Sequence, residues 1–153
     1  MIDVEIEDEA WARDLPEAHA LVVAAAQAAF AGAQREGAVV VLLTDDASVQ
    51  DLNNRFRGKD APTNVLSFPA PPNPEDHLGD VALAHGVCVR EAAEQGKSLA
   101  HHLQHLVAHG VLHLVGYDHE TDDEAEDMEG LERVVMAGLG APDPYGAEQG
   151  DDG

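Results

Sequence analysis

The chain has 153 residues, about the size of one domain, and 44% of them are hydrophobic, which is enough for a substantial core. Only 8 Lys and Arg residues accompany 30 Asp and Glu residues, so the net charge is −22. A protein this acidic is not expected to coat bare nucleic acid or to bind an anionic membrane through a broad basic surface.

The negative charge is concentrated at the two ends of the chain. Residues 1–20 hold seven acids and one base, and residues 120–153 hold twelve acids and one base. The middle of the chain, residues 21–119, has a net charge of only −5. The acidic ends are typical of a solvated surface and leave room for a small basic region between them.

Cysteine content and the N-terminal sequence indicate a cytoplasmic protein. Cys88 is the single cysteine, so the chain can form no internal disulfide and has no CxxC metal motif. The first ten residues lack the basic start and apolar stretch of a signal peptide. The most apolar stretch, residues 20–33, is too short to span a bilayer. We therefore expect no membrane partner.

The first third of the chain predicts a strand, a helix and a second strand. Apolar and acidic residues alternate over 3–7, which is typical of a short edge strand. Asp14, followed by Pro16, predicts the start of a helix that extends to about residue 35. The valine-rich residues 38–43 predict a strand buried on both faces.

A second helix and a loop are predicted next. The helix is capped by residues 44–46, and its apolar face is formed by Val49, Leu52 and Phe56. Residues 55–63 contain Gly58 and Pro62, which predict a loop. Two further strands are expected over residues 64–68 and 78–84, separated by the proline-rich, irregular segment 69–77.

The last part of the chain predicts three helices, over residues 87–95, 99–115 and 122–139. Ser98 is the expected N-cap of the middle helix. The last helix is expected to bury Met128, Leu131, Val135 and Leu139. Residues 141–153 contain no core residue, so we expect a disordered acidic tail after a single domain of residues 1–140.

Three histidines have the spacing of a metal site. His109 and His113 lie one turn apart on a predicted helix, so both rings project from one face. Gly116 permits the left-handed conformation that would let the chain turn back and bring His119 to the same point. Three imidazoles with one open position are the ligand set of a catalytic zinc ion, and we expect one Zn²⁺ per chain. Surface or core histidines are the alternative.

The same spacing occurs in the metzincin protease motif HExxHxxGxxH. In this chain Gly110 occupies the position of the Glu that serves as the general base in those proteases. The sequence therefore predicts a metal site without the proteolytic base, and it offers no other obvious general base.

Three segments resemble the YbeY family of bacterial endoribonucleases, which act in ribosomal RNA maturation. They are HGVLHLVGYDH at residues 109–119, RGKDAPTNVLSFP at residues 57–69, and LGDV at residues 78–81. The segments occur in the order and spacing of the family, and the resemblance covers about residues 38–140.

The resemblance implies an α/β (α+β) fold with a small mixed four-stranded sheet, about five helices, and a metal site on a central helix. It implies zinc held by His109, His113 and His119, with an arginine near the metal that corresponds to Arg57. It also implies single-strand-specific cleavage in 16S ribosomal RNA 3′-end maturation and ribosome quality control. The implied partners are ribosomal RNA and ribosomal or ribosome-assembly proteins, and DNA is not expected.

The one local basic cluster of the chain surrounds Arg57. Arg55, Arg57 and Lys59 are three of its eight basic residues and lie within five positions. We expect the planar guanidinium of Arg57 to stabilise charge on phosphoryl oxygens and so to be catalytic together with the ligand His113. Arg55 and Lys59 are expected to bind flanking phosphates. Solvated charges, or an ion pair of Arg57 with Asp60, are the alternative.

Three more polar residues are candidates for the surroundings of the metal. We expect Asp118 to orient a ligand ring, His105 to place a polar group one turn before the first ligand, and Asp80 to support the site. A turn-forming role for Asp118 and a strand-end role for Asp80 are equally compatible with the sequence. His101 and His102 are expected at the surface.

Two other functions stay open at this point. One is a zincin-type metalloprotease, which Gly110 disfavours, and the other is a non-catalytic, metal-containing ribosome assembly factor. The acidic charge also predicts weak binding of the isolated protein to naked RNA, so a ribosome-bound partner would have to present the substrate.

Overall fold

The structure is a computed structural model, and it describes residues 1–118 and 120–145. Its described strands form one sheet in the order β1-β2-β4-β3 and are β1 (Ile2–Ile6), β2 (Ala38–Thr44), β3 (Val65–Pro69) and β4 (His77–Ala84). The first three strands of that order are parallel, and β3 runs antiparallel to β4. The predicted small mixed four-stranded sheet is therefore confirmed.

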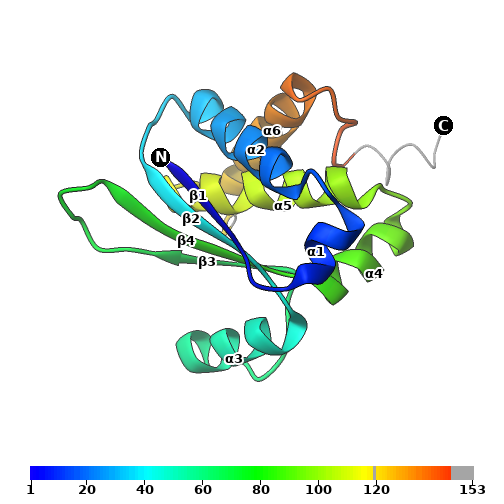
Figure 1. Cartoon of the computed structure of the whole chain (residues 1–153). Helices are drawn as coiled ribbons and strands as arrows, with labels where there is room; N and C mark the ends of the chain where they lie inside the picture. Colours follow the sequence, from blue (N-terminus) through cyan, green and yellow to red (C-terminus); the bar gives the residue numbers. More distant parts are fainter. Residues whose placement is uncertain (119, 146–153) are drawn as a thin grey trace.

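Six helices surround the sheet in the described part of the chain. They are α1 (Glu9–Asp14), α2 (Ala18–Ala33), α3 (Asp46–Arg57), α4 (His85–Gln95), α5 (Leu99–Leu114) and α6 (Asp122–Gly138). In Figure 1, α2, α5 and α6 cover one face of the sheet and α3 lies against the other. Helix α5 contacts α2, α4, α6, β3 and β4, so the helix predicted to carry the metal is the central one.

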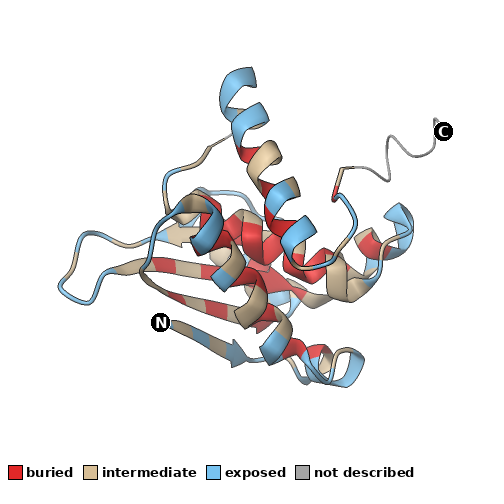
Figure 2. Cartoon of the chain, turned by 90° about the horizontal axis from the view of Figure 1, so that it is seen from above, coloured by how far each residue is buried: buried red, intermediate tan, exposed pale blue. Residues whose placement is uncertain are grey.

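The hydrophobic core is divided by the sheet. On the α5 side, buried strand residues such as Val41, Val81 and Leu83 pack against helix residues such as Val107 and Val111. The smaller cluster on the α3 side is formed by Val49, Leu66, Ala82 and Ala84. Figure 2 shows that α5 is the helix with the most continuous buried surface. No helix among the described residues is long and apolar enough to cross a bilayer.

The helix predicted to end near residue 35 is confirmed as α2, but its predicted start is wrong. Helix α2 begins at Ala18, and Asp14 is the last residue of a separate short helix, α1, rather than an N-cap. Helix α1 is capped by Asp8, whose carboxylate accepts a hydrogen bond from the backbone N–H of Ala10 at 2.9 Å. Its Trp11 is fully buried and donates from Nε1 to the Thr44 carbonyl at 3.0 Å, so a tertiary contact stabilises this short helix.

The loop predicted over residues 55–63 begins later than expected. Helix α3 extends through Arg57, and Gly58 ends it with a φ of 71°, in the left-handed region. Arg55 and Arg57 therefore lie on the last turn of a helix. The helix continues past residue 55 because its apolar positions extend to Phe56, and it ends only where Gly58 adopts the left-handed conformation.

The C-terminal segment also differs from the expectation of a disordered tail over residues 141–153. Pro144 is buried, and Tyr145 is half-buried and hydrogen-bonded to α6. Residues 141–145 therefore pack against the domain beyond the boundary predicted at residue 140. Residues 146–153 lie outside the described part, so that portion of the expectation stays a prediction.

Helix α5 approaches the sheet closely at Gly110. A Cβ at this position would lie 2.8 Å from Cγ1 of Val81 and 3.2 Å from Oγ of Ser67, both on the sheet. Val81 is fully buried and β-branched, so it has little freedom to move. The residue that replaces the protease Glu is thus a glycine because there is no space for a side chain.

We expect Gly110→Ala to destabilise the protein even though Ala favours helices. Overpacking a core costs about 1–3 kcal/mol, and the higher helix propensity of Ala returns only about 1 kcal/mol. The free energy of unfolding in urea should therefore fall by up to about 2 kcal/mol.

Gly130→Ala is the matched control, because a Cβ at that position in α6 would meet no side chain or neighbouring element of the described residues within 4 Å. It should raise the free energy of unfolding by about 0.5–1 kcal/mol. Equal stabilisation by both substitutions would show that α5 does not need the close approach.

Candidate functional site

The candidate metal ligands lie at the C-terminal end of α5. His109 and His113 are four residues apart and therefore project from the same side of the helix. Both are partly exposed, whereas most of α5 is buried. Gly116 follows with a φ of 113°, which confirms the predicted left-handed turn. His119 lies outside the described residues, so the convergence of the three rings stays a prediction.

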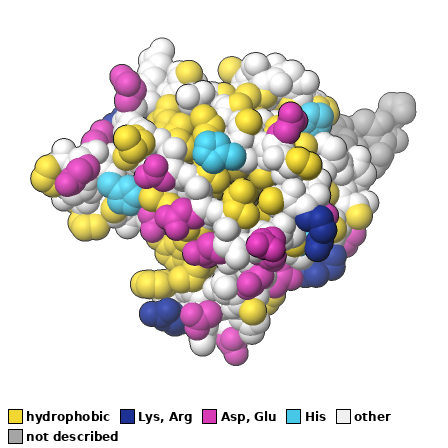
Figure 3. Space-filling view, in the orientation of Figure 1, with side chains coloured by type: hydrophobic (Ala, Val, Ile, Leu, Met, Phe, Trp, Pro, Cys, Tyr) yellow, Lys and Arg dark blue, Asp and Glu magenta, His cyan; other side chains and the backbone are white. Residues whose placement is uncertain are grey.

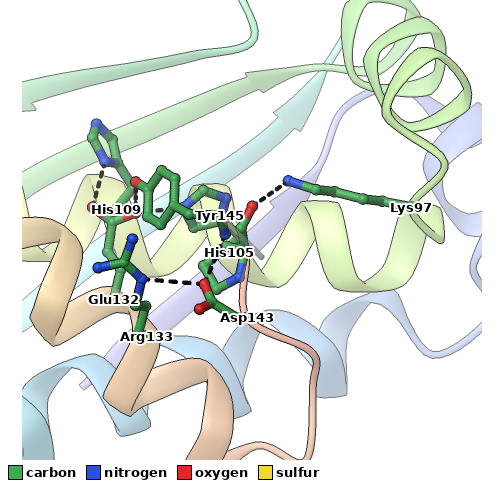
Figure 4. A network of polar contacts seen from close by, with 8 residues as sticks. Lys97, His105, His109, Glu132, Arg133, Asp143 and Tyr145 are labelled. Carbon is green, nitrogen blue, oxygen red and sulfur yellow. Dashed lines mark hydrogen bonds and ion pairs between the residues drawn. The ribbon is translucent and has the colours of Figure 1, made fainter. Parts of the chain in front are cut away.

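A buried carboxylate on α6 faces this histidine-bearing side of α5. Glu132 is fully buried, and its Oε2 lies 3.2 Å from Nδ1 of His109. Its Oε1 is hydrogen-bonded to Nε2 of His105 and accepts the hydroxyl of Tyr145 at 2.8 Å. Figure 4 shows these four side chains meeting between α5, α6 and the C-terminal segment.

The hydrogen bonds keep Glu132 ionised. Burial alone would raise the pKa of its carboxyl group, but the hydrogen bonds from His105 and His109 outweigh burial and hold the pKa at about 2. An ionised carboxylate only accepts hydrogen bonds. Tyr145 responds in the opposite sense, because burial and the neighbouring charge of Glu132 raise the pKa of its phenol.

Sequence reasoning missed both Glu132 and Tyr145. The signal for Glu132 was the helical pattern, because it lies four residues after Met128 and three before Val135, both of which are buried. A carboxylate in that register is buried with them and needs partners. No comparable pattern pointed to Tyr145, because only the fold brings it to α6.

Arg57 lines a groove on the α3 side of the sheet. The groove has a volume of about 480 Å³ and is lined mainly by side chains of α3, β3 and β4, namely Leu42, Leu52, Phe56, Arg57, Ser67, Phe68, Pro69 and Asp80. Phe56 is 63% exposed, and its ring meets that of Phe68 edge-on, with 5.4 Å between centroids. Exposed aromatic and cationic side chains thus lie together here.

The basic cluster is exposed and only weakly paired. Arg55 forms an i,i+4 ion pair with Asp51 at 3.4 Å, and Arg57 forms no ion pair within the described residues. Asp60, the predicted alternative partner of Arg57, accepts a hydrogen bond from Gln50 instead. Lys59 and Arg57 also line a second hollow of about 380 Å³ beside Pro62 and Thr63. In Figure 3, basic side chains lie at one end of α3 and again on the side of α1 and α4, and acidic side chains are spread over the visible face, α3 included.

Ser67 on β3 connects the two candidate regions. It lines the groove together with Arg57, and its hydroxyl donates to the Gly110 carbonyl of α5 at 3.3 Å. Gly110 is the neighbour of His109. No described contact joins Arg57 directly to His109 or His113, so the structure places them near a common strand and leaves their approach to one substrate as a prediction.

The remaining candidates are distributed differently. His105 lies beside His109 on the same carboxylate, as a residue near the ligands would. Asp80 instead faces the α3 side of the sheet and pairs with Nε2 of His77 at 3.0 Å, away from α5. Asp118 follows the Gly116 turn, next to the third candidate ligand.

The expectation that His102 lies at the surface is wrong. It is only 3% exposed, and its Nε2 is 2.9 Å from Oε1 of Glu91 on α4. His102 lies one turn further from the metal ligands than His105, so it belongs to the contact between α4 and α5. Burial lowers the pKa of His102, although its hydrogen bond to the Glu91 carboxylate opposes the shift.

No group of three or more His, Cys, Asp or Glu side chains within residues 1–118 and 120–145 is arranged to hold an ion. The donor chemistry of the two described candidates nevertheless fits zinc. A histidine whose Nδ1 is hydrogen-bonded to a carboxylate is the usual form of a zinc-binding imidazole, and His109 has that contact.

Comparisons with known proteins agree with the resemblance in the sequence. The family model described as Endoribonuclease YbeY matches residues 3–140. Proteins named Endoribonuclease YbeY include one from Azorhizobium caulinodans, 52% identical over 94% of this chain and 95% of the relative, and one from Maricaulis maris, 49% identical over 94% and 91%. A solution structure from Thermotoga maritima is 26% identical, covers 91% of both chains and has a TM-score of 0.57.

The lowered pKa of His102 predicts a pH-dependent stability. An unfolded histidine has a pKa near 6.5, so between that value and the lower native pKa the unfolded chain binds a proton that the native protein excludes. This contribution to stability is present above about pH 6.5 and is lost as pH falls through the native pKa.

The measurement is the free energy of unfolding of the wild type and of His102→Gln between pH 7.5 and 5. The stability advantage of the wild type should shrink as pH falls, because the other histidines titrate in both proteins. A constant difference across this range would contradict the prediction.

Proposed function

Because this chain belongs to the YbeY endoribonuclease family, we propose that it is a zinc-dependent, single-strand-specific endoribonuclease of ribosomal RNA processing. The observation that carries the proposal is the placement of two family segments around β3. His109 and His113 lie on α5, and Arg57 lines the groove on the α3 side of the sheet. Ser67 of β3 lines that groove and donates to the Gly110 carbonyl of α5.

One Zn²⁺ per chain would be held by His109, His113 and His119. The contact between His109 and Glu132 supports this assignment, because it leaves Nε2 of His109 as the atom that would ligate the ion. When bound, zinc supplies a water molecule of lowered pKa and polarises a phosphoryl oxygen.

The substrate would be bound by side chains at the end of α3. Arg57 is exposed and permanently charged, so its planar guanidinium can bind two phosphoryl oxygens and stabilise the charge that gathers there in the transition state. Arg55 and Lys59 would bind the flanking phosphates. The exposed ring of Phe56 offers a surface on which an unpaired base can stack, which supports a preference for single strands.

The proposed context is the assembling ribosome in the cytoplasm, with 16S ribosomal RNA 3′-end maturation and ribosome quality control as the processes served. The net charge of −22 opposes broad contact with RNA, and the basic residues are confined to one short segment. We therefore propose that ribosomal or ribosome-assembly proteins present the RNA. DNA and membranes are not proposed as partners.

A peptidase is the weaker alternative. In the corresponding protease motif a Glu follows the first histidine, and here that position is Gly110, against Val81 of the sheet. A non-catalytic assembly factor is the other alternative, and it differs from the proposal only in lacking RNA cleavage.

We expect wild-type protein to contain about one zinc per chain and to cleave single-stranded ribosomal RNA. His113→Ala should lose both the metal and the activity. Arg57→Ala should keep the metal and lose about 10²–10³ in kcat, because one donor to the transition-state charge is removed. Metal analysis and a single-stranded RNA cleavage assay measure these outcomes.

Arg90→Ala is the matched control, because Arg90 is an exposed arginine paired with Asp46 on the surface and should not affect cleavage. Cleavage that is equal in all four proteins would indicate a contaminant and support an assembly factor. Hydrolysis of casein would support the peptidase.

Binding to naked RNA should be weak. At physiological salt we expect a dissociation constant above about 1 µM for single-stranded ribosomal RNA, the range of non-specific electrostatic binding. Titration monitored by fluorescence anisotropy at several salt concentrations measures this. Nanomolar, steeply salt-dependent binding would argue against a presenting partner.

A further inference from the structure

We propose that Glu132, fixed by Tyr145 of the C-terminal segment, is a positioning residue for the metal centre, holding the His109 ring so that its Nε2 faces the ion. This inference rests on the proposed function, because it assumes that His109 is a metal ligand. It adds two residues, from α6 and from the segment after it, to a site predicted from α5.

The geometry gives Glu132 three donors. Oε2 accepts a hydrogen bond from Nδ1 of His109 at 3.2 Å. Oε1 accepts hydrogen bonds from Nε2 of His105 and from the Tyr145 hydroxyl, the second at 2.8 Å. A charge with no exposure is tolerated only when its lone pairs are satisfied. Each of the three partner atoms must therefore carry a proton and donate it in a hydrogen bond to Glu132.

This requirement determines the tautomers of both rings. His109 must carry a proton on Nδ1, which makes Nε2 its ligating nitrogen. His105 must carry its proton on Nε2, and its Nδ1 is buried without a hydrogen-bond partner in the described part of the chain. His105 thus supports the carboxylate rather than the ion.

The C-terminal segment is attached at several points, which keeps Tyr145 in place. Lys97 Nζ donates to the Pro144 carbonyl at 2.6 Å, and Arg133 pairs with Asp143 at 3.3 Å. The Arg133 guanidinium also lies over the Tyr145 ring, 5.1 Å from its centroid. Figure 4 shows these contacts beside the Glu132 cluster. These contacts are directional, so they are suited to placing the phenol.

Glu91 on α4 offers a matched comparison, because its histidine partner lies on α5 like those of Glu132. It forms a carboxylate–histidine pair with His102, on the opposite side of His105 from the proposed ligands. If Glu132 only stabilises the fold, removing either carboxylate should affect stability and leave metal binding unchanged. If Glu132 positions His109, only its removal should weaken the metal site.

The experiment uses the full chain, freed of metal with a chelator and then titrated with Zn²⁺ in competition with a chromophoric chelator. We expect Glu132→Gln to weaken zinc binding by about 10- to 100-fold, the usual effect of losing a carboxylate behind a ligating histidine. Tyr145→Phe should weaken it by up to about tenfold, because one hydrogen bond to the carboxylate is lost. Glu91→Gln should bind zinc like the wild type.

Substitution with Co²⁺ gives a second readout, because its visible spectrum reports ligand geometry and should change in Glu132→Gln but not in Glu91→Gln. Circular dichroism checks that each variant is folded at the titration temperature, and Tyr145→Phe serves as the test if Glu132→Gln does not fold. Wild-type zinc affinity and cobalt spectra in both the Glu132 and Tyr145 variants would overturn this inference alone. A wild type that binds neither ion would overturn it together with the proposed function.

Discussion

The close contact between α5 and the sheet is the constraint on which the site depends. Gly110 and Val81 are too close for any side chain between them, so the helix lies directly on β3 and β4. This contact fixes the rotation of α5 about its axis. His109 then faces Glu132 of α6, and His113 follows one turn later, while the apolar side of the helix is buried.

That arrangement explains how an acidic protein can use a carboxylate inside its structure. Most of its acids are solvated, whereas Glu132 is enclosed by α5, α6 and the segment that follows α6. Glu132 has no exposed surface, so the stabilisation of its charge has to come from the hydrogen bonds of the cluster. Each of those hydrogen bonds orients a side chain, so the buried charge fixes the orientation of the rings of His105, His109 and Tyr145.

The local parts of the fold were largely predictable. The structure has the predicted strands, the Ser98 N-cap and the Gly116 turn. All of them follow from residue preferences that act over a few positions of the chain. The errors arose where tertiary contacts compete with such preferences. A buried Trp11 stabilises the short helix α1, and buried Pro144 attaches a segment whose composition resembles a free tail.

The sequence by itself determined which residue types the candidate site offers: three histidines at ligand spacing, one basic cluster, and a glycine where a protease would have its base. These are properties of residue type and spacing along a helix or loop, which the local backbone geometry translates directly. Only the tertiary structure decided which distant groups meet them. Glu132 faces His109 from 23 positions away, and Tyr145 joins from a further 13, because the packing of α6 on α5 brings together residues that no local rule relates.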